Sequence, residues 1–265
     1  METVLKQSMQ KPSGEFLQSF ARGLSVIRAF GPRSPVMTLS AVAEQTGLTR
    51  AGARRILLTL QSLGYVASEG RDFRLTPRIL DLGYSYLSSM PLWDIAQPIM
   101  EDLVGEVHES CSASVLEGGD IVYVLRVPTH RIMTIGLSIG SRLPAYATSM
   151  GRVLLGGLAP QELDAYLAKT KFTAYTKRTI TDPKALKKAV LADEKKGWSL
   201  VDQELEDGLR SISVPIVDGR GRILAAMNIS GQAARTSEAQ IVKTFLPRLK
   251  AAAERISAAL RMRRG

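Results

Sequence analysis

The stretch TLSAVAEQTGLTRAGARRILLTLQSLGYV, residues 38–66, has the pattern of two short helices joined by a tight turn. Thr38 can cap the first helix, and Gly47 permits the left-handed backbone that ends it. Thr49 can cap the second helix, which Gly64 ends. Two helices crossing over so short a turn are typical of a helix-turn-helix, whose second helix enters the major groove of DNA.

The second helix presents cations on the side that its apolar residues leave free. Arg50, Arg54 and Arg55 fall within about one and a half turns of it. Arginine suits DNA because it neutralises phosphate and its planar fork can bind guanine with two hydrogen bonds. The alternative is a solvated helix face. Leu58, also on the outer side, has no clear role: a DNA sugar edge, a partner subunit and the linker are all open to it. The residues expected to contact DNA are Thr49, Arg50, Ala51, Arg54, Arg55 and Arg71, and those expected to be buried are Ala53, Ile56, Leu57, Leu60 and Leu63.

The sequence around this motif completes a winged domain. A helix over residues 19–31 should precede it, and two short strands at 65–67 and 73–75 should form a wing around the Gly70 turn, with Arg71 at its tip. The first helix is expected to bury Phe20, Leu24, Ile27 and Phe30.

Beyond the wing the pattern changes. An unusually apolar helix at 78–89 ends at Pro91 and suits a linker between domains or a dimer contact. The rest predicts an α+β domain with an antiparallel sheet. The expected strands are 112–116, 121–127, 132–137, 211–217 and 223–229, and the expected helices are 95–108, 149–157, 160–169, 183–196 and a final one from 236 or 237 towards 264, which Pro247 should kink or divide.

These patterns divide the 265 residues into four parts. The N-terminal arm, residues 1–17, is expected to be flexible, and the winged helix-turn-helix domain covers 18–77. A linker helix occupies 78–91, and an α+β domain covers 92–265.

Composition narrows the class of protein. The net charge of +10 suits a polyanionic partner such as DNA, although a basic protein need not bind one. The single cysteine, Cys111, excludes an intrachain disulfide, and with only His108 and His130 beside it we expect no metal site and no cofactor. No signal peptide and no membrane-spanning apolar run is present, so a cytoplasmic protein is expected.

Several segments together resemble the IclR family of transcriptional regulators, from residue 17 to 262. They are the pattern from Phe20 to Phe30, the wing, residues 140–155 (GSRLPAYATSMGRVLL), residues 207–216 (DGLRSISVPI) and residues 225–230 (AAMNIS). Residues 126–135 (RVPTHRIMTI) and 143–152 (LPAYATSMGR) are most similar to the β-ketoadipate-pathway group, which regulates aromatic-acid catabolism. The resemblance implies a winged helix-turn-helix, a linker helix and, over residues 92–265, a GAF-like domain for effector binding and oligomerisation. It also implies dimers that often pair into tetramers.

A helix beginning near Thr148 and Ser149 can bind a carboxylate through its free backbone N–H groups. Met150 and Gly151 follow in the same turn, and Gly151 would let a ligand approach closely. The alternative is an ordinary helix cap.

A second set of candidates lies on the predicted sheet. Asn228 and Ser230 project from one face, and Ser211 repeats the pattern on a partner strand. A polar row is usually the solvent face of a sheet, but the resemblance implies a ligand cavity here, with Asp202 a weaker candidate. A carboxylate also favours a cation. Arg126 and Arg131 are nearest the subgroup motif, and we expect Arg131 in the site, although each could be a surface or interface residue.

These observations favour a homodimeric regulator that binds a roughly palindromic operator and responds to a small carboxylate, because one winged module contacts few bases. Two alternatives stay open. One is a constitutive DNA-binding protein whose second domain only oligomerises. The other is an enzyme, which the sequence disfavours because it lacks a GxSxG elbow, a GxxxxGK loop and a GxGxxG turn.

Overall fold

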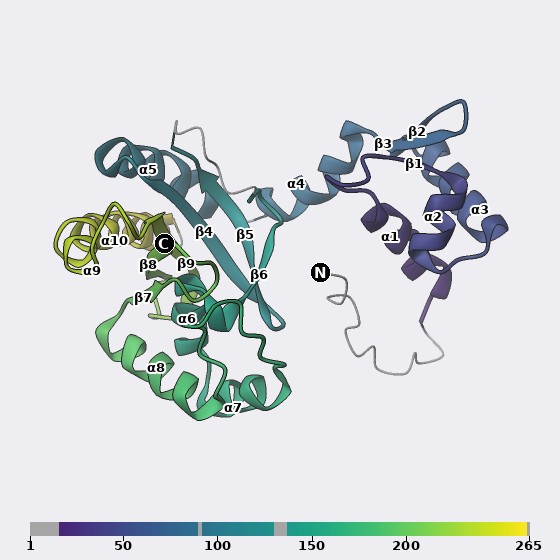
Figure 1. Cartoon of the computed structure of the whole chain (residues 1–265). Coiled ribbons are helices and arrows are strands. Elements are labelled where there is room, and N and C mark those ends of the chain that lie inside the picture. Colours follow the sequence, from purple (N-terminus) through teal and green to yellow (C-terminus); the bar gives the residue numbers. More distant parts are fainter. Residues whose placement is uncertain (1–15, 90–91, 130–136, 264–265) are drawn as a thin grey trace. The chain divides into compact units, whose positions relative to one another are not determined.

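The computed structural model describes residues 16–89, 92–129 and 137–263 (Figure 1). Its contacts divide the chain into two compact units between Tyr86 and Leu87, inside the expected linker helix. Nearly all of the expected N-terminal arm lies outside the described residues.

The N-terminal unit packs three helices against a three-stranded antiparallel sheet of order β1-β3-β2. Thr38 caps α2, since its hydroxyl accepts the Ala41 N–H at 3.3 Å, and Gly47 ends that helix with a φ of +66°. Strand β1 was not foreseen: it pairs with the wing and turns the expected hairpin into a sheet. The elements are α1 Gln18–Ala29, β1 Val36–Thr38, α2 Leu39–Thr46, α3 Arg50–Ser62, β2 Val66–Glu69 and β3 Asp72–Leu75.

Two expectations about burial in this unit are wrong. Phe20 is 67% exposed and Leu24 is 39% exposed, because α1 turns Val26 and Ala29 inward instead. Leu63, 52% exposed, follows the last residue of α3 as its cap and so lies beyond the buried face.

The helix expected as a linker is α4, Leu80–Ser88, which follows a single 3-10 turn at Pro77–Ile79. None of its side chains is buried, and four large apolar ones are exposed. Its expected end at Pro91 lies outside the described residues. The exposed apolar residues of α4 are Leu80, Leu82, Tyr84 and Tyr86.

The C-terminal unit is built on a six-stranded antiparallel sheet of order β6-β5-β4-β9-β8-β7 (Figure 1). The four central strands match the predicted ones, whereas the short edge strands β6 and β7 were missed. The strand expected at 132–137 lies outside the described residues except for Leu137, which is not in a strand. The strands are β4 Ser110–Glu117, β5 Asp120–Val127, β6 Arg142–Pro144, β7 Ser199–Asp202, β8 Leu209–Val217 and β9 Ile223–Gln232.

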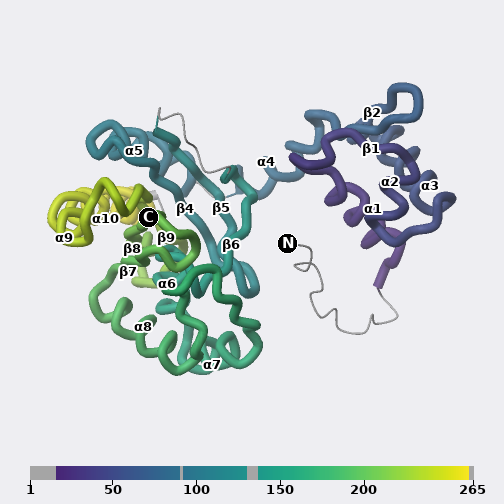
Figure 2. The backbone as a smooth tube through the Cα atoms, in the orientation of Figure 1, coloured from purple at the N-terminus to yellow at the C-terminus, as the bar shows by residue number. Residues whose placement is uncertain are grey.

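Helices cover both faces of this sheet (Figure 2). On one face α5 and α10 bury a core that includes Met227 and Ile229. On the other, α6, α7 and α8 form a second core with Ile121 and Tyr123. A π-helical segment that ends at Phe245, two residues before Pro247, divides the last helix, as a proline without an N–H predicts. The helices are α5 Leu92–Val107, α6 Ser149–Gly156, α7 Pro160–Lys169, α8 Pro183–Lys196, α9 Glu238–Gln240 and α10 Leu246–Arg263, with the π segment at Ile241–Phe245.

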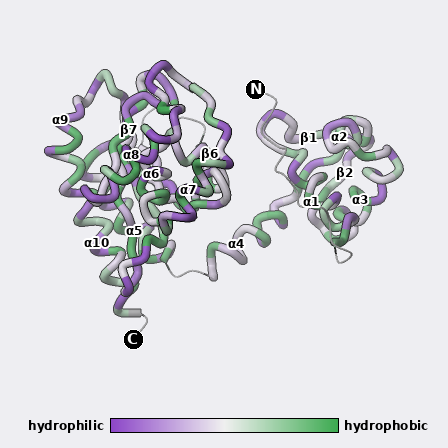
Figure 3. The backbone as a smooth tube through the Cα atoms, turned by 90° about the horizontal axis from the view of Figure 1, so that it is seen from below, coloured by the Kyte–Doolittle hydropathy of each residue, from purple (hydrophilic) through white to green (hydrophobic). Residues whose placement is uncertain are grey.

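Hydrophobic and hydrophilic residues alternate along most of the backbone, as Figure 3 shows. Among the described residues, no helix combines the length and the apolar character that a membrane span requires.

Candidate functional sites: a DNA-reading helix and a sheet cavity

Helix α3 is held in place from one side and left free on the other. Ala53, Leu57 and Leu60 are buried in the N-terminal core. Thr49 caps the helix, since its hydroxyl accepts the Gly52 N–H at 3.1 Å. The cap fixes where the helix begins and therefore which residues face outward.

The arginines of α3 are available to a partner. Arg50, Arg54 and Arg55 are exposed, and within the described part of the chain none of them makes a side-chain hydrogen bond or an ion pair. They lie in the first two turns of the helix, where the backbone N–H groups add partial positive charge. Ala51 is exposed beside them.

The wing is joined to α3 by a side-chain hydrogen bond. Gln61 donates from Nε2 to the Ser68 hydroxyl at 2.9 Å. At the tip, Gly70 has a φ of +60° and Arg71 is exposed, whereas Arg74 is paired with Glu69 at 3.0 Å. The structure thus brings the predicted DNA-contacting residues onto α3 and its attached wing.

A cavity of about 1230 Å³ lies in the C-terminal unit on the face of the sheet that α6 covers. Its walls come from strands β4, β5, β8 and β9, the start of α6 and the segment 205–208. Six predicted effector residues line it, together with neighbouring apolar side chains: Thr148, Ser149, Met150, Ser211, Asn228 and Ser230.

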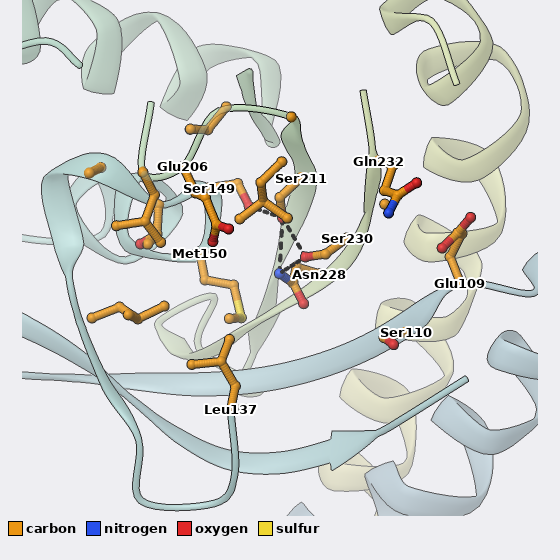
Figure 4. Close-up of a pocket in the computed structure, with 18 of the residues that line it drawn as sticks. Glu109, Ser110, Leu137, Ser149, Met150, Glu206, Ser211, Asn228, Ser230 and Gln232 are labelled. Atoms are coloured by element: carbon orange, nitrogen blue, oxygen red, sulfur yellow. Dashed lines mark hydrogen bonds between the residues drawn. The ribbon is translucent and has the colours of Figure 1, made fainter. Parts of the chain in front are cut away.

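Figure 4 shows the polar centre of the cavity wall. Asn228 donates from Nδ2 to the hydroxyls of Ser211 and Ser230, both at 2.9 Å, and the two hydroxyls are 3.1 Å apart. Ser149 joins them through a 2.8 Å hydrogen bond with Ser211. These groups come from β8, β9 and α6. Asn228 and Ser211 are buried, which excludes the alternative that this polar row is a solvent face.

Strand register explains how the cluster forms. Ser211 lies opposite Ser230, and Asn228 lies opposite Ser112 on β4, so all four side chains share one face. The Oδ1 atom of Asn228 also accepts the Ser112 N–H at 3.2 Å. Ser112 was missed by sequence reasoning, although the alternation from Ser110 through Ser112 to Ser114 carries the period of such a face.

At the start of α6, Thr148 acts as an ordinary helix cap. The Thr148 hydroxyl accepts the Gly151 N–H at 3.1 Å, so that N–H is already engaged. Met150 lines the cavity and its sulfur accepts a hydrogen bond from the Ser114 hydroxyl at 3.3 Å. Gly151 does not line the cavity: a Cβ there would lie 2.0 Å from the Ala145 carbonyl oxygen, so this glycine permits close packing of two chain segments.

Asp202 is placed away from the cavity wall. Its carboxylate is engaged by Arg210, whose Nε is 2.6 Å away, and by Arg178. Burial raises its pKa, but hydrogen bonds from Arg210 and Gln203 outweigh burial and lower the pKa overall. Arg131, the expected cation, lies outside the described residues.

Arg126, weighed beside Arg131, lines the cavity. It is half-buried and donates from a terminal guanidinium nitrogen to the Ser112 hydroxyl at 3.3 Å. A bulge in β5 sets its direction: Ala113 pairs with Leu125 but Ser114 pairs with Tyr123, which leaves Val124 as an extra residue.

The bulge has a direct effect on the two sheet faces. Val124 and Leu125 both join the core under α5 and α10, while Tyr123 and Arg126 line the cavity on the opposite face. Burial raises the pKa of the Tyr123 phenol to about 12, against an opposing effect of the Arg126 charge, so this phenol stays neutral at physiological pH.

The charged groups of the cavity differ in exposure. Glu206 and Asp207 are exposed, as is Arg235. Glu109 is buried and lies against Gly231, with its carboxyl carbon 3.3 Å from where a Cβ would be. The cavity thus carries basic groups at the half-buried Arg126 and the exposed Arg235, and carboxyl groups at the buried Glu109 and the exposed Glu206 and Asp207.

A buried ion pair behind α6 was also missed. Arg152 donates to Glu204 at 2.5 Å, and both side chains are less than a tenth exposed. Burial raises the pKa of the Glu204 carboxyl even though the Arg152 charge opposes the rise. The Arg152 Nε is buried without a hydrogen-bond partner among the described residues. Nothing in the local sequence signals this pair, which joins residues 52 positions apart.

Two family models match the chain. The IclR helix-turn-helix domain matches residues 19–70, and the bacterial transcriptional regulator IclR C-terminal domain matches residues 84–258. The chain is 44% identical to the Pca regulon regulatory protein of Pseudomonas putida over 90% of this chain and 82% of that protein.

Two solved structures are also similar. A transcriptional regulator from Rhodococcus sp. RHA1 is 56% identical, with a TM-score of 0.85 over 92% of this chain and 98% of that one. The inducer-binding domain of a PobR double mutant from Acinetobacter, in complex with 3-hydroxybenzoic acid, is 29% identical, with a TM-score of 0.59 over 62% of this chain and 96% of that one. The relatives are regulators rather than enzymes, and this chain belongs to the IclR family of transcriptional regulators.

Proposed function

We propose that this regulator binds operator DNA through α3 and the wing, and that a small carboxylate in the cavity of the C-terminal unit changes this binding. The first half of the proposal rests on Arg50, Arg54 and Arg55, which directly follow the Thr49 cap, are exposed and have no side-chain partner among the described residues. Cations so placed can neutralise phosphates and bind guanine. Such a protein acts in the cytoplasm, where the DNA is.

A mobility-shift titration with the DNA upstream of the regulator's own gene tests this half. Arg54→Ala should weaken binding by about 1–3 kcal/mol for each lost base contact. Arg74→Ala is the matched control, because its guanidinium is already paired with Glu69. If Arg54→Ala binds as tightly as the parent at the same salt concentration, α3 does not read the operator.

The effector half rests on Arg126 facing the buried cluster of Asn228, Ser211, Ser230 and Ser149. A carboxylate can accept hydrogen bonds from both the guanidinium and the hydroxyls. The relatives support an aromatic-acid ligand, since one is named for the Pca regulon and another was solved with 3-hydroxybenzoic acid. Thr148 and Met150 complete the proposed wall.

Isothermal titration with 4-hydroxybenzoate, protocatechuate and β-ketoadipate tests the effector half. Arg126→Gln should weaken binding of the preferred acid by about 1.5–3 kcal/mol, the worth of a hydrogen bond to a charged group. Operator binding without ligand should be unchanged. If none of these acids binds, the regulator whose C-terminal unit only oligomerises becomes the better description.

We also propose that the linker, residues 78–91, joins a DNA-binding domain at 18–77 to an effector domain at 92–265 and transmits the signal. A ligand can shift the spacing of two DNA-reading helices only through its different affinity for the two arrangements. The exposed apolar residues of α4, among them Leu80 and Tyr84, support a dimer contact there. Sedimentation of the full chain with and without Tyr84→Glu tests the dimer and its pairing into tetramers. Footprinting tests the roughly palindromic operator.

A further inference from the structure

The outward side of α3 ends in an apolar residue that the DNA-binding proposal does not use. Ala51, Arg54, Arg55 and Leu58 are spaced i, i+3, i+4 and i+7, so they form one row opposite the buried residues of the helix. Leu58 is 39% exposed within this row. A large apolar side chain on the outer face of a recognition helix therefore lies where base edges are read.

The polar side chains elsewhere on α3 are already engaged. The Thr59 hydroxyl donates to the Arg55 carbonyl and the Ser62 hydroxyl to the Leu58 carbonyl, both at 2.9 Å. Gln61 is bonded to the wing. The helix contains no Asn, Asp or Glu.

This inventory restricts what the helix can read. Adenine is typically bound by Asn or Gln and the cytosine amino group by Asp or Glu. What remains is arginine, which suits guanine, and apolar surface, which suits the C5-methyl group of thymine. Thymine is the one base that presents a methyl group in the major groove.

We propose that Leu58 packs against a thymine methyl group in each operator half-site and so selects thymine next to the bases bound by Arg54 and Arg55. The inference rests on the proposed function of α3. Covering one methyl group is worth about fourfold in affinity for each half-site. The occupant of this apolar position is thus the base itself rather than a second protein surface.

Replacing thymine by deoxyuridine removes only that methyl group, which gives a direct test. The full-length protein is titrated against its footprinted operator and against operators in which each thymine is replaced in turn. One symmetry-related pair of thymines should stand out. Affinity should fall about fourfold when one thymine of the pair is replaced and about fifteenfold when both are replaced. Leu58→Ala should bind the parent operator with a similar loss of affinity. In this variant, replacing that thymine by deoxyuridine should cause no further loss.

Leu63→Ala is the matched control, because Leu63 is also an exposed leucine but follows the end of the helix. It should keep the full sensitivity to deoxyuridine. Equal weakening of thymine and uracil operators by Leu58→Ala, or retained sensitivity at every thymine, overturns the proposal. If Leu58→Ala has a changed sedimentation coefficient but keeps the sensitivity to deoxyuridine, Leu58 belongs to a protein contact and the proposal is also overturned. If the parent protein does not bind its operator, the proposed function itself fails.

Discussion

On α3 the arginines are exposed and make no side-chain hydrogen bond or ion pair within the described residues, whereas in the cavity Asn228, Ser211, Ser230 and Ser149 are buried and bonded to one another. The positive charges of the first surface are therefore available to a negatively charged partner. The polar groups of the second are already hydrogen-bonded to one another. An effector bound at the proposed site would therefore exchange hydrogen bonds rather than simply add them, which favours ligands that both donate and accept.

Replacing an exposed arginine on α3 and a buried one on α6 should give the largest difference in stability. Arg152→Ala leaves Glu204 buried without its partner and should lower the free energy of unfolding by about 3–5 kcal/mol. Arg54→Ala, on the exposed surface, should change it by less than about 0.5 kcal/mol. Urea unfolding followed by circular dichroism measures both. Similar losses in the two variants would mean that α3 also depends on its arginines for stability.

Two glycines extend the contrast to packing. Gly151→Ala places a Cβ against the Ala145 carbonyl and should destabilise the C-terminal unit by about 1–3 kcal/mol. Gly23→Ala, on α1, meets no atom within 4 Å and should stabilise the N-terminal unit by about 0.5–1 kcal/mol. Thermal unfolding of the two variants should show shifts of opposite sign. A stabilised Gly151→Ala would contradict the close approach of the two segments.

Two wing arginines sharpen the idea that only unpartnered charge is available to DNA. Arg71→Gln should reduce the slope of log affinity against log salt by about one for each wing that contacts a phosphate. Arg74→Gln should change the slope less, because Arg74 is paired with Glu69. Fluorescence anisotropy at several salt concentrations gives the slopes. Equal changes in slope would show that the ion pair with Glu69 does not reduce the contribution of Arg74 to DNA binding.

The smallest effect concerns the turn before β9. Burial raises the pKa of Asp218, but hydrogen bonds from the Arg222 side chain and from the backbone N–H groups of 220 and 222 outweigh it and lower the pKa to about 2. A lowered carboxyl pKa contributes stability that is present above about pH 4 and is lost as the pH falls towards 2. Asp218→Asn should therefore lower stability at pH 6 more than at pH 3. An equal difference at both pH values in urea unfolding would exclude this linkage.

Much of the helix-turn-helix could be predicted because its signals are local. The Thr38 and Thr49 caps, the Gly47 turn and the three arginines all lie within one short stretch. Helices α7 and α8 were predicted with their observed bounds, since a proline opens each of them. Burial was harder: the outward position of Phe20 depends on how α1 packs against the other helices.

The cavity was only partly predictable because its residues meet through strand register. Asn228, Ser230 and Ser211 could be placed on one face from their spacing, but the contribution of Ser112 follows from pairing with a strand 116 residues away. The direction of Arg126 was hidden because a bulge breaks the period of two. The edge strands β6 and β7 are short and give almost no periodic signal.

That bulge has a consequence for anyone who would retune this regulator as a biosensor. A count of residues in β5 puts the cation at 126 on the same sheet face as Tyr123, because Val124 is the extra residue that offsets the strand. Substitution libraries leave this count unchanged, whatever side chains they sample. Deleting Val124 would remove the bulge and leave Tyr123 and Arg126 on the cavity face with a single residue between them. Libraries that vary the length of β5 therefore test the bulge itself, which substitutions alone do not.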